Sequence, residues 1–143
     1  MEHVRSVAQR LIKKYKTKDP FELAEYLKIK IMYDDLGTRT RGFYQACPKL
    51  KIIHIHNNLD YINKKIVCSH ELGHAILHSK LNIVFLQKHT LCIKDKFERE
   101  ANIFAAELLI QNELLKEYPE YSLEQIAALH NIPVEFFKLK YNM

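Results

Sequence analysis

Two long segments with helical periodicity lie between residues 60 and 117 of this 143-residue sequence, and they constrain its fold more than any other feature. Apolar residues recur with the period of an amphipathic helix from about Asp60 to His78 and again from about Lys94 to Glu117. Residues 81–93 between them are apolar without a regular period, so we expect a loop there. A chain of this length with two such helices is predicted to form one mainly helical domain.

Shorter elements surround the two long helices. The pattern predicts helices over residues 2–16 and 20–27, the second of which begins with Asp19 and Pro20 in N-cap and first-turn positions. Ser122 and Gln125 form a capping-box pattern, and Asn131 to Pro133 separates two short closing helices. Before the first long helix, segments 29–34 and 51–56 alternate with period two, and Phe43 and Tyr44 follow the punctuating glycines Gly37 and Gly42. We expect these three segments to form a small antiparallel three-stranded sheet.

These elements predict an α+β fold with a single domain over residues 1–143. Residues 122–141 are expected to pack on that domain as a small helical tail. The sequence has only three glycines and four prolines and shows no repeat or linker, in agreement with this interpretation. It lacks a long apolar run, a secretory signal and a disulfide framework, so we expect a cytoplasmic protein without a membrane span.

Charge is distributed unevenly along the chain. The net charge is +5, and residues 1–65 carry +7 while residues 101–143 carry −3. A basic half can face nucleic acid, but solvated helix faces explain it as well. The segment 122–141 resembles a helix-turn-helix superficially, yet its last helix offers Val134, Phe136 and Phe137 rather than base-reading side chains. We therefore expect no direct contact with nucleic acid.

The first long helix contains an HExxH motif, His70-Glu71-Leu72-Gly73-His74. Histidines at positions i and i+4 project from one helix face about 5.4 Å apart along the axis, so both can bind one tetrahedral Zn²⁺ ion. Glu71 is rotated away from the ligand positions, where it can accept a proton from a water that the metal activates. The motif therefore predicts a zinc site with Glu71 as the catalytic base.

A catalytic zinc site needs a third protein ligand, and the second long helix offers two candidates. At about 100° per residue, Glu98 lies near the apolar stripe that includes Ala101, on the same flank as Asn102. Glu100 lies on the other flank, nearer a row with Glu107 that we expect to face solvent. We predict Glu98 as the third ligand, with Glu100 as the alternative. Asn102 is the expected hydrogen-bond partner of a ligand histidine.

Other histidines are weaker candidates for metal ligands. His78 continues the i+4 spacing, but the helix drifts by about 40° at each step, so we interpret it as a helix-end residue. His54 and His56 share one face of a predicted strand and are interpreted as core or surface residues.

The two motif segments together resemble the ImmA/IrrE family of zinc metallopeptidases. The resemblance is carried by HELGHAILH at 70–78 and EREANIFAAELL at 98–109, and it extends over nearly the whole chain. It implies a compact zincin-like (gluzincin-like) core in which His70, His74 and Glu98 bind zinc and Glu71 is the base. It also implies cleavage of a partner regulator, often a helix-turn-helix repressor of a phage or mobile element. Ile110-Gln111 stands where the family often has Met-Pro, a change expected to affect only the helix end.

The expected function is therefore that of a zinc-dependent endopeptidase, an anti-repressor that hydrolyses a partner repressor and works as a monomer. One alternative is a catalytically silent zinc-containing module that sequesters a repressor or toxin partner. Another is a DNA-binding regulator that uses the basic half. The intact Glu71 favours the enzyme, because a structural zinc site has no need of a base. This ligand set does not specify zinc alone, because two histidines and a carboxylate also suit Mn²⁺, Fe²⁺ or Co²⁺.

Overall fold

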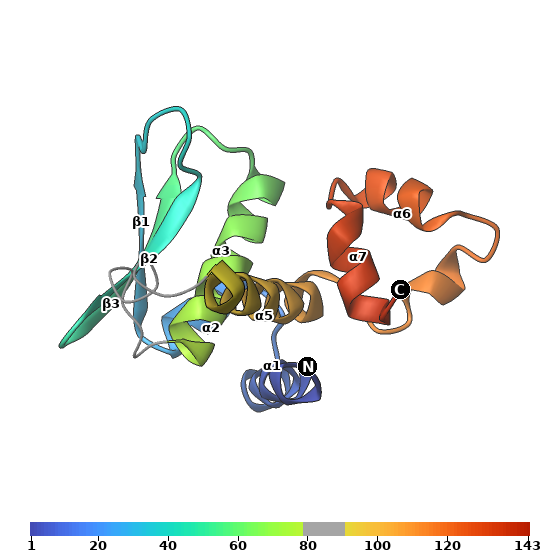
Figure 1. The fold of residues 1–143 in the computed structure, drawn as a ribbon, viewed down its shortest axis with the longest axis horizontal. Coiled ribbons are helices and arrows are strands. Elements are labelled where there is room, and N and C mark those ends of the chain that lie inside the picture. The colour runs from blue at the N-terminus through green and yellow to red at the C-terminus, as the bar shows by residue number, and fades with distance from the viewer. Residues whose placement is uncertain (79–90) are drawn as a thin grey trace.

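The computed structural model describes the backbone of residues 1–78 and 91–143, and the side chains outside residues 79–94. Figure 1 shows a small sheet and the closing helices at opposite ends of the molecule, with two long helices between them. The elements in chain order are α1 (Glu2–Tyr15), α2 (Pro20–Tyr26), β1 (Ile29–Asp34), β2 (Gly42–Cys47), β3 (Leu50–His56), α3 (Tyr61–Leu77), α5 (Leu91–Leu109), the 3-10 helix η1 (Leu114–Glu117), α6 (Leu123–His130) and α7 (Val134–Tyr141). The α+β class predicted from the sequence is confirmed.

Capping residues identified in the sequence lie at the N-termini of two of these helices. The Asp19 side chain accepts a hydrogen bond from the backbone N–H of Phe21, and Ser122 forms the complete capping box with Gln125. The predicted loop at 81–93 lies mostly outside the described residues, and α5 begins at Leu91. No helix within the described ranges is both long enough and apolar enough to cross a membrane.

The strand pairing differs from the predicted antiparallel sheet. The strand order is β1-β3-β2, with β3 parallel to β1 and antiparallel to β2. The expectation of an all-antiparallel sheet is therefore wrong. Ile53 and Ile55 of β3 are fully buried, so β3 takes the central position, where both of its edges are paired and one face is covered. Residues 35–41 carry the chain past β3 to the far edge, from which the short β2–β3 turn returns it.

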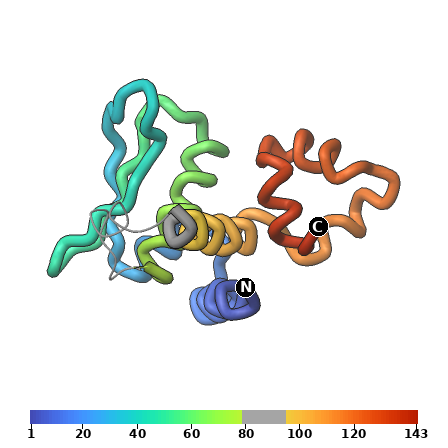
Figure 2. Tube along the Cα trace, viewed as in Figure 1, coloured from blue at the N-terminus to red at the C-terminus, as the bar shows by residue number. Residues whose placement is uncertain are grey.

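Apolar side chains form two clusters, and α5 contributes to both. The larger cluster joins the sheet to α1, α2 and α3, and Phe104 and Leu108 of α5 belong to it. The smaller cluster lies among η1, α6 and α7, where Ala106 of α5 and the adjoining Ile110 pack against Phe137. The chain trace in Figure 2 shows α5 running from the sheet side of the molecule toward the closing helices.

The second long helix is shorter than predicted, because it ends at Leu109 rather than near Glu117. Side chains from elsewhere in the chain satisfy backbone carbonyl groups at this end. Lys18 Nζ donates to the carbonyl of Ile110 at 3.1 Å, and Tyr141 Oη donates to the carbonyl of Gln111 at 2.8 Å. Because these two carbonyl groups receive hydrogen bonds from side chains, the helix can end here without a further turn to supply backbone N–H donors.

Glu107 faces the protein interior, contrary to the prediction that it faces solvent. Its side chain is 5% exposed and lies 2.7 Å from Nζ of Lys140, whose side chain is 4% exposed. Gln9 also donates to Glu107, and Arg5 Nε lies 3.6 Å from its other oxygen. Glu107 thus joins α1, α5 and α7 through one buried carboxylate.

This network predicts a large stability effect for Glu107→Gln. The substitution preserves the shape of the side chain but leaves the buried Lys140 without its counter-charge, so the free energy of unfolding should fall by about 3–5 kcal/mol. Urea denaturation followed by circular dichroism measures the change. Glu113→Gln is the matched control, because Glu113 pairs with Lys116 on the exposed surface and such pairs contribute little. Equal denaturation midpoints for both variants would contradict the prediction.

Candidate metal centre

Helix α3 presents the HExxH motif toward α5. Asp60 caps the helix by accepting a hydrogen bond from the backbone N–H of Asn63 at 2.8 Å. Leu72 and Ala75 are fully buried in the larger apolar cluster and fix the rotation of the helix about its axis. With that face buried, His70 and His74 project from a different face, one turn apart, toward the facing helix.

Helices α3 and α5 approach closely at Gly73. A Cβ atom at this position would lie only 3.1 Å from Cα and from the carbonyl oxygen of Ala101, and 3.2 Å from Cβ of Phe104. The absence of a side chain at Gly73 therefore permits the close approach of the two helices. This approach brings the acidic positions around Ala101 within reach of the α3 histidines.

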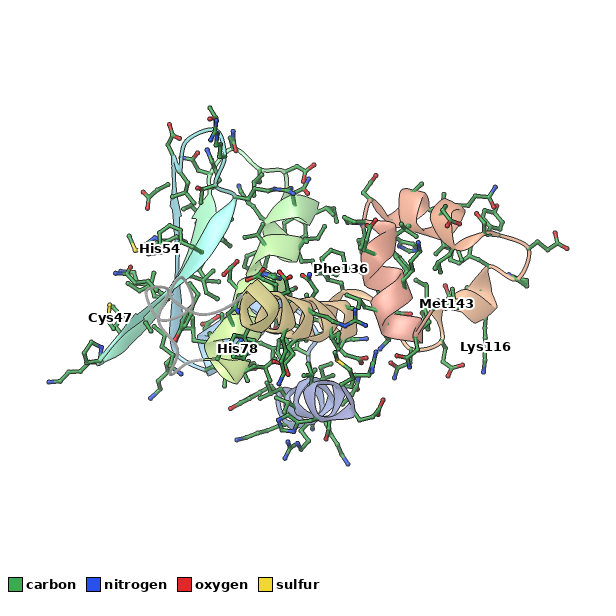
Figure 3. The ribbon with its side chains drawn as sticks, in the orientation of Figure 1. Cys47, His54, His78, Lys116, Phe136 and Met143 are labelled. Carbon is green, nitrogen blue, oxygen red and sulfur yellow. The ribbon has the colours of Figure 1, made fainter. Side chains whose placement is uncertain are left out.

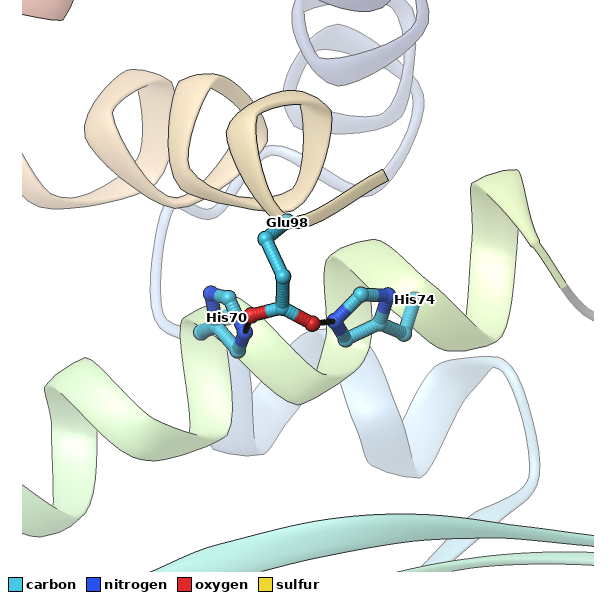
Figure 4. Close-up of side chains that lie close together, drawn as sticks. All are labelled: His70, His74 and Glu98. Atoms are coloured by element: carbon cyan, nitrogen blue, oxygen red, sulfur yellow. Dashed lines mark hydrogen bonds and ion pairs between the residues drawn. The ribbon is translucent and has the colours of Figure 1, made fainter. Parts of the chain in front are cut away.

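His70, His74 and Glu98 form a compact group. Glu98 Oε2 lies 3.0 Å from His70 Nε2, and Glu98 Oε1 lies 2.8 Å from His74 Nε2 (Figure 4). One donor atom from each residue can be chosen so that all three lie within 4.8 Å of one another, and in the part of the chain that the structure describes this is the one group able to hold a metal ion. The Glu98 side chain is 47% exposed, so the group is accessible to solvent on that side.

Asn102 lies behind His70, on the same flank of α5 as Glu98. Its Oδ1 atom is 2.7 Å from His70 Nδ1. The amide oxygen is an acceptor, so the bond keeps a ring proton on Nδ1. Nε2 faces Glu98 and donates to it here, and this nitrogen is the one free to bind a metal once it gives up its own proton. An imidazole held in this way is oriented to bind a metal through Nε2.

Glu71 lies next to the group without belonging to it. Its side chain is 12% exposed, and Oε2 lies 3.9 Å from His70 Nε2. Burial raises the pKa of Glu71, although the two histidines and a hydrogen bond from the backbone N–H of Tyr44 act in the opposite direction. A carboxylate with a raised pKa accepts a proton more readily than an ordinary one, which suits a general base.

Glu98 supplies a negative charge to this group. Hydrogen bonds from His70 and His74 hold the pKa of Glu98 far below its usual range, so this carboxylate is ionised. Burial disfavours the charged form of His70, but the hydrogen bond to Glu98 and the nearby Glu71 carboxylate outweigh it and raise the pKa of this imidazole. A divalent cation could replace the shared protons and bind the Glu98 carboxylate together with the imidazole nitrogens of His70 and His74.

The structure places His78 and Glu100 differently from the other candidates. Glu100 does not join the group; its Oε1 atom lies 3.1 Å from His78 Nε2. His78 is the C-cap residue of α3, in agreement with its interpretation as a helix-end residue, but its Nδ1 atom also lies 3.0 Å from His74 Nδ1. Burial lowers the pKa of His78. Sequence reasoning missed this contact, for which the regular spacing of His70, His74 and His78 was the available signal.

The remaining histidine candidates lie on the sheet. The His54 ring stacks on Phe43 and its Nε2 atom is 2.8 Å from Gln45 Oε1. His56 is buried, with Nε2 2.8 Å from the carbonyl oxygen of Gly37. Both lie on the face of β3 opposite Ile53 and Ile55. Figure 3 shows His54 on the sheet and His78 at the end of α3, well apart in this view.

Comparisons with known proteins identify the family of this chain. Residues 24–142 match the peptidase-family model for the IrrE N-terminal-like domain. The chain is 42% identical over 139 residues to "uncharacterized immunity region protein 2" of Bacillus phage phi105, covering 96% of this chain and 88% of that protein. It is 35% identical over 136 residues to the metallopeptidase ImmA of Bacillus subtilis (strain 168), covering 91% of this chain and 79% of that protein.

A solved structure shares the fold. A transcriptional regulator of Mycobacterium tuberculosis superposes with a TM-score of 0.69 at 14% sequence identity, covering all of this chain. The chain spans 47% of that regulator's length, so the match shows a shared fold and not a shared activity. The family model and the similarity to ImmA carry the assignment: this chain belongs to the ImmA/IrrE family of metallopeptidases.

Proposed function

We propose that this protein is a zinc-dependent endopeptidase that cleaves a partner regulatory protein, such as a helix-turn-helix repressor of a phage or mobile element. The observation that carries the proposal is the convergence of His70, His74 and Glu98, with Glu71 beside them. Two imidazole nitrogens and one carboxylate oxygen are a donor set of catalytic zinc sites, which keep a fourth position open. Structural zinc sites are usually closed by four protein ligands.

Each residue of the site has a separate role in this proposal. His70 and His74 would bind the zinc through Nε2 and Glu98 through its carboxylate. Zinc in such a site polarises the substrate carbonyl and increases the acidity of water. Glu71 takes the proton of the attacking water and delivers it to the leaving amine. Asn102 keeps His70 in the tautomer that binds through Nε2.

The sheet supports a peptide as the substrate. Among the described strands, β2 is paired with β3 along one edge only, and the backbone N–H of Tyr44 in β2 contacts Glu71. An unpaired strand edge offers backbone donors and acceptors to an extended peptide. A peptide paired with β2 would run beside Glu71 and the neighbouring metal group.

The relatives support a regulatory protein as that peptide's source. One relative is described as a phage immunity-region protein and another as a metallopeptidase. Regulators that control phage immunity are therefore the first candidate substrates, and a helix-turn-helix repressor is the specific class that we propose.

Co-expression with a candidate repressor tests the proposal. We expect the repressor to disappear and fragments to form with the wild-type protein, and the repressor to stay intact with Glu71→Gln. Mass spectrometry of the fragments identifies the cleaved bond. Loss of the repressor with both proteins would contradict hydrolysis by Glu71. An intact repressor that co-purifies with both proteins would identify a sequestering module in place of a protease.

A further inference from the structure

We infer that His78 and Glu100 are positioning residues that orient His74 toward the metal, an inference that rests on the metal-dependent function proposed above. His78 Nδ1 lies 3.0 Å from His74 Nδ1, and His78 Nε2 lies 3.1 Å from Glu100 Oε1. Neither residue belongs to the group of three candidate ligands. Together with His74 they form a continuous hydrogen-bonded chain that leads from the metal group to α5.

The hydrogen-bond chemistry of this chain fixes where its protons lie. Binding a metal through Nε2 requires that His74 carry its proton on Nδ1. His78 Nδ1 must then accept that hydrogen bond, which places the proton of His78 on Nε2. His78 Nε2 in turn donates to Glu100, whose carboxylate only accepts. All the bonds therefore run in one direction, from His74 to Glu100.

Packing holds the chain in place. The His78 side chain is 6% exposed, and its ring centroid lies 4.5 Å from that of Phe97. The backbone N–H of His78 donates to the carbonyl oxygen of His74 at 2.8 Å, so the two residues are also tied through the helix end. A buried imidazole with both ring nitrogens engaged has little freedom to turn, so His78 can fix the orientation of the His74 ring.

The same short segment of α5 fixes both candidate histidine ligands. Ala101 contacts Gly73 where the helices approach. On one flank of Ala101, Asn102 accepts from His70; on the other flank, Glu100 accepts from His78. Positions 100 and 102 thus orient the two imidazoles from opposite sides of the contact, which gives Glu100 a role different from that of a metal ligand.

Zinc affinity tests the inference without requiring activity. Measured by competition with a chromophoric chelator in the Glu71→Gln background, His78→Leu should weaken zinc binding about 10- to 100-fold. His78→Gln should retain most of the affinity, because its amide can accept from His74 and donate to Glu100. His3→Gln, which alters an exposed histidine of α1, should bind zinc like the parent. Wild-type affinity in His78→Leu overturns the inference.

A second variant and a spectroscopic measurement separate positioning from folding. Glu100→Ala removes the terminal acceptor from a side chain that is 20% exposed, and we expect weaker zinc binding with an unchanged unfolding midpoint of the metal-free protein. In the zinc-loaded parent, imidazole ¹⁵N spectra should show His78 protonated on Nε2 alone. A proton on Nδ1 of His78 overturns the inference while zinc binding itself persists. A parent that binds no zinc refutes the proposed function and the inference together.

Discussion

Replacing Glu71 with glutamine is expected to lower kcat for peptide hydrolysis by about 10²- to 10⁴-fold, because the amide cannot accept the proton of the attacking water. The substitution nearly preserves size and removes no atom from the group formed by His70, His74 and Glu98. Zinc content and KM should therefore change far less than kcat. The measurement is cleavage of an identified substrate peptide by wild-type and variant protein with equal metal content.

Glu113→Gln provides the matched control for this substitution. Glu113 precedes η1 and pairs with exposed Lys116, so the same chemical change there should leave kcat unaltered. If Glu71→Gln retained wild-type kcat, the base would have to be another group, and the proposed role of Glu71 would be wrong.

Removing the Glu98 carboxylate should have the largest effect on metal binding. In Glu98→Ala the two histidines lose the oxygens that lie 3.0 and 2.8 Å from their Nε2 atoms. Removing a residue that hydrogen-bonds a metal ligand weakens metal affinity by about 10- to 100-fold. Removing the ligand itself should weaken it further, so the zinc affinity should fall by more than about 100-fold. Equilibrium dialysis with metal analysis measures this loss, and peptide hydrolysis should disappear with it.

The comparison with Glu100 makes this result decisive. Glu100→Gln retains an acceptor oxygen for His78 and should affect zinc affinity much less than Glu98→Ala. If Glu100 were the third ligand instead, the order of the two effects would be reversed. The two variants thus discriminate between the two ligand candidates that the sequence offers.

Much of the candidate site could be predicted from the sequence because it depends on local helical geometry. The i, i+4 spacing brings His70 and His74 to one face, and the position of Glu98 relative to Ala101 turns its carboxylate toward them. Asn102, one turn after Glu98, lies on the same flank and contacts His70 as expected. In each case the period of one helix determines on which flank the side chain lies.

The features that were predicted wrongly depend on contacts between distant segments. The strand order follows from the burial of β3 against the helices, which alternation along a strand does not specify. Glu107 lies opposite the apolar stripe of α5, where the helical period alone predicts solvent. Arg5 of α1 and Lys140 of α7 enclose it, and this enclosure arises only when the three helices meet.

The dual membership of α5 in the two apolar clusters links metal binding to the order of the closing helices. One helix carries Glu98 near the sheet and, beyond it, Ala106, which packs in the smaller cluster. A ligand that binds only the folded state increases its stability in proportion to the logarithm of ligand concentration. The stabilisation by zinc extends along α5 to the smaller cluster, which includes residues of α6 and α7. The amide hydrogens of α6 and α7 should therefore exchange more slowly as zinc is added, although neither helix supplies a ligand.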